Sequence, residues 1–140
     1  MSLVAAVERG QDLARRGAAG AIRPVEMSMY QLWRHLVRQS AKVSRAVGRR
    51  ISFDAPEVDE GEEGVYADAA SLTAETLARH APRLNGRGSL SRVNRVEFVE
   101  GQRPGAVVEG TALSITLSPE QGVAGRPSSA KVLTALDRGD

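Results

Sequence analysis

The sequence contains no cysteine, and only five of its 140 residues are aromatic. Without cysteine, disulfides, thiolate metal sites and thiol nucleophiles are all excluded. Because large aromatic anchors are scarce, we expect a core built mainly from Val, Leu, Ile and Ala, and a modest stability. A chain of this length can bury one hydrophobic core without a metal or a disulfide, which favours a single domain.

The sequence also lacks long apolar runs. No stretch approaches the roughly 20 consecutive apolar residues that a membrane span needs. The first nine residues have neither the charged start nor the long apolar run of a secretory signal. We therefore expect a cytoplasmic protein without membrane contact, either free or incorporated into a virion or a similar particle.

Histidine is scarce as well. His35 and His80 lie on different predicted helices, and neither has a second histidine at metal-ligand spacing. We expect His35 on the polar flank of its helix and His80 in a last helical turn. Ser128 and Lys131 have a Ser-x-x-Lys spacing, but the companion elements of the penicillin-binding enzymes are missing. These observations predict a non-enzymatic protein with no metal and no cofactor.

The net charge of +2 hides a strong separation of charge along the chain. Residues 1–50 carry ten basic and three acidic side chains, whereas residues 51–80 carry one basic and eight acidic ones. Six of these acids lie in residues 54–64, which have no buried-side periodicity and indicate a solvated acidic loop. The loop lacks the ligand spacing of an EF-hand, so calcium binding of that kind is not expected.

The N-terminal 24 residues are predicted to form a helical arm with a hinge. A thin apolar stripe that includes Leu3, Val4 and Val7 predicts a helix over residues 2–16, and the Gly-Ala run at residues 17–20 ends it. Such a helix is marginal in water, so it needs a groove to lie in. We expect Leu3, Val4 and Val7 to contact a neighbouring subunit, and residues 25–140 to form one α+β domain.

The strongest pattern in that domain is an amphipathic helix over about residues 25–47. Its apolar positions fall within one arc, and we expect Trp33 and Leu36 at the centre of this arc to be packed core. The opposite side of the helix carries five cations at helical spacing. These cations are Arg34, Arg38, Lys42, Arg45 and Arg49.

The remaining elements are shorter. We predict a strand at residues 51–53, a helix over residues 67–80 stopped by Pro82, and a last helix over residues 128–136. A hairpin is expected between residues 92–100 and 106–118, around the turn at residues 101–105. The expected fold is α+β: the long helix packs on a small antiparallel sheet built around this C-terminal hairpin, with short flanking helices and extended arms.

The basic helix face indicates a binding protein. Few Asn or Gln side chains accompany the cations and no helix-turn-helix precedes them, which disfavours sequence-specific DNA reading. We therefore expect protein partners, through self-association and neighbouring subunits, and the acidic segment of another copy is one candidate. The leading function is a structural or adaptor subunit of a bacterial or phage particle, such as a head-to-tail connector, tail-terminator or tail-completion component. The alternative is a nucleic-acid-binding accessory protein that uses the cationic face.

Overall fold

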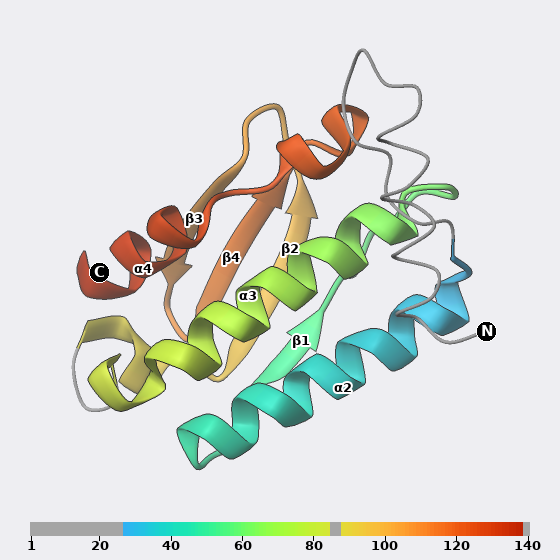
Figure 1. Ribbon diagram of the computed structural model, residues 1–140. Coiled ribbons are helices and arrows are strands. Elements are labelled where there is room, and N and C mark those ends of the chain that lie inside the picture. The colour runs from blue at the N-terminus through green and yellow to red at the C-terminus, as the bar shows by residue number, and fades with distance from the viewer. Residues whose placement is uncertain (1–26, 85–87, 139–140) are drawn as a thin grey trace.

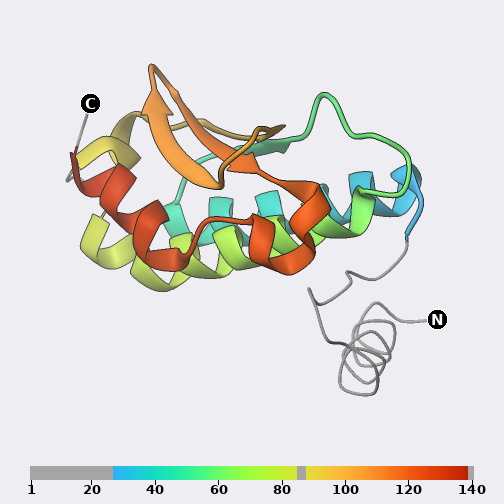
Figure 2. The same cartoon turned by 90° about the horizontal axis from the view of Figure 1, so that it is seen from above.

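The computed structural model describes residues 27–84 and 88–138. These residues form two layers, with a four-stranded sheet in one layer and helices α2, α3 and α4 in the other (Figures 1 and 2). The predicted N-terminal arm, with Leu3, Val4 and Val7, lies outside the described residues. None of the helices in the described ranges is both long and apolar enough to cross a membrane.

Helix α2 spans Met29–Val47 and is the long amphipathic helix expected from the sequence. It begins with a capping box, in which the Ser28 hydroxyl accepts from the Gln31 N–H at 3.1 Å and the Gln31 side chain accepts from the Ser28 N–H at 2.8 Å. It ends at Gly48, whose positive φ of 83° suits the left-handed C-cap. Both ends of the helix are therefore set by local sequence.

The sheet contains β1 (Ser52–Asp54), β2 (Arg95–Glu100), β3 (Gly105–Glu109) and β4 (Ala112–Leu117), in the order β1-β2-β4-β3. Strand β2 pairs in parallel with both β1 and β4, and only β3 runs antiparallel, alongside β4. A crossover through α3 connects the parallel strands β1 and β2, as parallel pairing requires.

The α+β class is confirmed, but the expected antiparallel sheet is wrong, because the sheet is mixed. Residues 106–118 are not one strand paired with residues 92–100. The chain turns at Gly110, whose φ of 60° suits the first position of a two-residue hairpin turn, and this turn splits the segment into β3 and β4. Strand β4 then lies between β2 and β3, where both of its edges are paired.

Helix α3 (Glu63–Leu84) is longer than the predicted residues 67–80. It begins earlier because the Glu63 carboxylate accepts from the Gly61 N–H at 3.0 Å and lies at the helix N-terminus, where a negative charge is favourable. It also continues past Pro82, which lies inside its last turn. The predicted acidic loop is consequently reduced to residues 55–62 between β1 and α3.

The hydrophobic core fills the space between the two layers. Along β2 and along residues 113–117 of β4, buried side chains alternate with partly or fully exposed ones. The core is lined by Leu32 and Val43 from α2, Tyr66 and Leu77 from α3, Val96 and Phe98 from β2, Leu113, Ile115 and Leu117 from β4, and Leu136 from α4. The C-terminal helix α4 (Ser129–Arg138) matches its predicted position and packs beside β3 (Figures 1 and 2).

Candidate functional site

The apolar arc of α2 is covered on one side only. Leu36 is 7% exposed, which confirms its predicted place in the core, but Trp33 is 61% exposed and the prediction that it is core is wrong. Met29 and Val37, two further apolar residues of α2, are about half exposed. The helix is thus rotated relative to the orientation that its hydrophobic pattern indicates.

The physical reason lies in the packing of α2 against α3. His35, expected on the polar flank, is only 4% exposed, and its Nε2 lies 3.0 Å from the Ala67 carbonyl oxygen and 2.7 Å from the Ser71 hydroxyl oxygen. Because a carbonyl oxygen only accepts, Nε2 carries the proton. Burial lowers the pKa of His35, which favours the neutral ring, and the ring is a polar contact between the two helices. The side of α2 that bears Trp33 is left to solvent.

This exposed side carries a compact group of aromatic and cationic side chains. The rings of Tyr30 and Trp33 are stacked, with centroids 6.3 Å apart, and the Arg34 guanidinium carbon lies 5.8 Å from the centroid of the Tyr30 ring. Val37 and Arg38 are exposed one turn further along the helix. We call Tyr30, Trp33, Arg34, Val37 and Arg38 the aromatic–arginine face.

Four of the five predicted partner-binding cations share the exposed surface of α2. Arg34, Arg38, Lys42 and Arg45 are all exposed. Arg49 lies after the helix end, and its guanidinium donates to the backbone carbonyls of Leu90 and Val93. The structure therefore separates Arg49 from the cationic face and places it in a contact between the α2–β1 connection and the segment that leads into β2.

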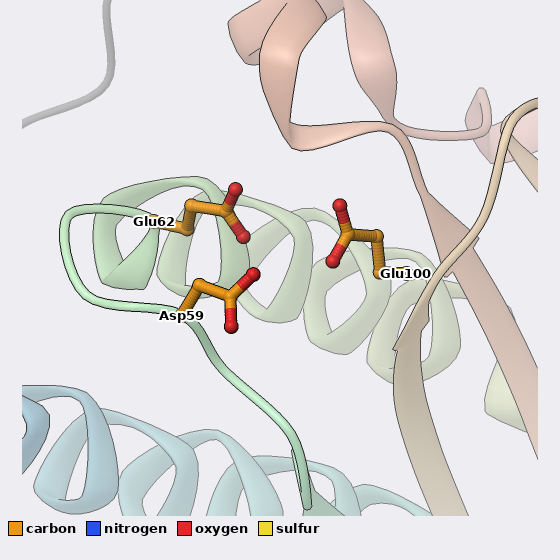
Figure 3. Close-up of side chains that lie close together, drawn as sticks. All are labelled: Asp59, Glu62 and Glu100. Carbon is orange, nitrogen blue, oxygen red and sulfur yellow. The ribbon is translucent and has the colours of Figure 1, made fainter.

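A second charged group forms where the loop of residues 55–62 meets the end of β2. Carboxylate oxygens of Asp59, Glu62 and Glu100 lie within 4.8 Å of one another, and Figure 3 shows the three side chains pointing toward a common space. Hard divalent cations prefer such oxygen ligands. Sequence reasoning missed this acidic cluster because Glu100 is distant in sequence from the loop, and only the β1–α3–β2 crossover brings them together.

Burial and mutual repulsion both act on the acidic cluster. The pKa of Glu62 is raised by desolvation, and further by the neighbouring carboxylates, Glu100 first among them. One Glu62 oxygen is buried without a hydrogen-bond partner in the structure. Buried Tyr66, whose hydroxyl donates to the Glu57 carbonyl oxygen at 3.4 Å, is also affected: burial together with these charges raises its pKa to about 12. The cluster is therefore an unfavourable concentration of negative charge in the folded protein.

Replacing Glu62 with glutamine is expected to stabilise the protein at neutral pH. Because the folded-state pKa of Glu62 is raised, the folded protein binds this proton more tightly than the unfolded chain does. Wild-type stability should thus fall as pH rises from the ordinary glutamate pKa through the raised one. Above that window Glu62→Gln should be more stable by less than about 1 kcal/mol, since the carboxylate is partly solvated.

Urea unfolding of both proteins between about pH 4 and pH 8 measures this difference. His35 is present in both proteins, so its own titration cancels in the comparison. Glu60→Gln, on the exposed part of the same loop, is the matched control and should show no such pH-dependent gain. An equal gain in both variants, or no gain for Glu62→Gln, would contradict a specific repulsion at the cluster.

The fold and these surfaces define a two-layer α+β domain with an exposed aromatic–arginine face on one helix and an acidic cluster beside it. Comparison with known families matches residues 5–136 to the family described as a domain of unknown function (DUF4908). The chain belongs to this family. No curated protein and no solved structure matches it.

Proposed function

We propose that this protein is a non-enzymatic structural or adaptor subunit that self-associates, with the aromatic–arginine face of one copy docking on the acidic loop of another. The observation that carries this proposal is the exposure of Trp33 and Tyr30, at 61% and 65%, beside Arg34 and Arg38. Incorporation into a bacterial or phage particle remains a prediction from the sequence.

The composition of the face supports a protein contact. Trp, Tyr and Arg are the residues most enriched among those that dominate binding energy at protein interfaces. Here they are adjacent on one rigid helix, where Tyr30 stacks on Trp33 and Arg34 lies over the Tyr30 ring. Side chains held in this way lose little further freedom on binding. A set of large exposed apolar groups also carries a solvation cost that a partner would remove.

Charge complementarity supports a second copy as that partner. Glu57, Asp59 and Glu60 are exposed on the loop of residues 55–62, and Val58 between them is partly exposed. The loop therefore offers an acidic, partly apolar counterpart to the cationic and aromatic side chains of α2. Figures 1 and 2 show that this loop and the start of α2 lie at the same end of the described fold, so reciprocal contacts between two copies can use both surfaces.

Sedimentation velocity of the full-length protein tests the proposal. We expect a concentration-dependent dimer or larger species that weakens between about 50 and 300 mM salt, because the contact is largely electrostatic. Arg34→Glu combined with Arg38→Glu should give a monomer, and so should Glu57→Arg combined with Glu60→Arg. Mixing the two variants should restore association, since each then supplies the charge that the other needs.

Arg83→Glu is the charge control, because Arg83 is exposed in the last turn of α3. Figure 1 shows that this turn lies at the opposite end of the fold from the acidic loop and the start of α2. It should associate as the wild type does. At concentrations too low for association, all variants should have the wild-type melting temperature, because only association itself adds stability. A wild-type protein that stays monomeric at every concentration would contradict the proposal. Association that survives both double variants would show that other surfaces hold the copies together.

Nucleic-acid binding is the second candidate function, because exposed aromatic rings beside arginines also suit the stacking of single-stranded bases. The supporting observation is that Arg34, Arg38, Lys42 and Arg45 are exposed on the same helix as Trp33. Retention of labelled single-stranded and duplex DNA at low and moderate salt tests it. Micromolar binding that is lost on replacing Arg34, Arg38 and Arg45 would favour this function over self-association.

A further inference from the structure

The two edges of the sheet differ in how well they are protected. Edge strands of native proteins are usually short, charged, bulged or covered, because their unpaired backbone groups invite another strand. Strand β1 follows this rule, with only three residues that end in Asp54. Strand β3 is the other edge, and its five residues contain no proline and no lysine, with one acid, Glu109, at the end.

A groove of about 480 Å³ runs along the free edge of β3, between this strand and α4. Four consecutive strand residues, 105–108, line it. Because successive side chains of a strand point to opposite faces, a groove lined by consecutive residues follows the edge of the strand and not one of its faces. Its other wall is one side of α4, formed by Ala130, Lys131, Thr134 and Ala135.

Hairpin geometry determines which backbone groups of β3 point into this groove. The two-residue turn at Gly110 and Thr111 makes Glu109 and Ala112 the first pair of the hairpin. In such a hairpin the residues that flank the turn bond to each other, and the bonding alternates along the strand. The N–H and C=O groups of Ala106 and Val108 therefore point away from β4, toward the groove.

The side chains of the groove indicate the chemistry of its occupant. Ala106, Ala130 and Ala135 are small, so the space between strand and helix is apolar and leaves room for side chains of another segment. Val107, on the strand, is 47% exposed. The charged member is Lys131, which is exposed on α4 and places a cation at the groove. An extended peptide that carries apolar side chains and a carboxylate is complementary to each of these features.

We infer that the groove between β3 and α4 binds an extended peptide, which adds as a fifth strand on the free edge of β3 and places a carboxylate on Lys131. The backbone groups of Ala106 and Val108 supply the main-chain hydrogen bonds, and the alanines of α4 receive alternate side chains of the peptide. This surface is separate from the aromatic–arginine face and does not depend on the proposed self-association.

A displayed library of random peptides with free C-termini, selected on the full-length protein, tests the inference. We expect enriched peptides with micromolar affinity for the wild type. Ala135→Trp fills the groove and should weaken binding at least about tenfold. Ala46→Trp, at an exposed alanine of α2, is the matched control and should bind as the wild type does. Amide signals of Ala106 and Val108 should shift on binding in NMR spectra.

Two further measurements separate strand addition from apolar contact alone. Methylating the backbone nitrogens of the peptide one at a time should weaken binding at alternate positions only, because every second N–H bonds to β3. Lys131→Gln should weaken binding of a peptide that has a free carboxylate. It should not change the binding of the same peptide after its carboxylate has been amidated or removed.

The inference is overturned if no peptide distinguishes the wild type from Ala135→Trp. Binding that tolerates nitrogen methylation at every position would exclude a fifth strand. Binding that is unaffected by Lys131→Gln would exclude the carboxylate contact. Methylating or amidating the peptide leaves the protein unchanged, so these two tests do not depend on whether a protein variant folds.

Discussion

Replacing Leu36 with alanine is expected to lower the free energy of unfolding by about 2–5 kcal/mol, whereas Trp33→Ala should change it by less than about 1 kcal/mol. Leu36 is buried between α2 and the rest of the core, so its truncation removes packing contacts and leaves a cavity that the surroundings fill only in part. The loss is a large share of the roughly 5–15 kcal/mol that a small domain has.

The contrast between these two residues tests the orientation of α2. Trp33 has the larger side chain, and a helix oriented as its hydrophobic pattern indicates would lose more stability at Trp33 than at Leu36. Urea unfolding of both variants measures the order directly. A Trp33→Ala protein that unfolds as readily as Leu36→Ala would show that Trp33 is covered, and it would remove the main support for a docking face.

Replacing Arg49 with alanine is also expected to have a large effect, lowering the free energy of unfolding by about 2–4 kcal/mol. Its guanidinium donates to the carbonyls of Leu90 and Val93, next to two fully buried side chains. Hydrogen bonds from a charged donor are worth more than neutral ones, and their loss leaves the carbonyls without this donor. The contact joins the end of α2 to the segment before β2, so we expect the placement of β2 to weaken with it.

Arg50→Ala provides the matched control, because Arg50 is the next residue and is exposed. It should change stability by no more than about 0.5 kcal/mol. Arg49→Lys should recover only part of the lost stability, since one ammonium group cannot reproduce the two hydrogen bonds that the guanidinium donates to two carbonyls. Arg49 would instead belong to the binding surface if Arg49→Ala left the melting temperature unchanged and weakened self-association as strongly as Arg38→Glu.

Local patterns predicted the elements better than their arrangement. The capping residues Ser28 and Gly48 and the helical period between them are adjacent in sequence, so α2 forms close to its predicted bounds. Leu113, Ile115 and Leu117 likewise alternate with polar residues, which is the local period of a half-buried strand, and β4 forms there. Pairing could not be predicted in the same way, because the partners of β4 are chosen by contacts between segments and not by β4 alone.

By itself, the sequence determined the α+β class, the long helix, the cations at Arg34, Arg38, Lys42 and Arg45 on one of its sides, and the absence of thiol chemistry. These follow from composition and from periods of two and 3.6 residues, which act within a few turns of chain. Tertiary structure alone decided what each surface meets. Helix α3 covers the side of α2 that bears His35 and leaves Trp33 exposed. The crossover brings Glu100 close to Asp59 and Glu62. Helix α4 lies beside the edge strand β3 and forms a groove with it. The exposed Trp33, the acidic cluster and the groove all depend on which distant segments pack together. Burial and electrostatic contact are properties of the folded surface and not of local spacing.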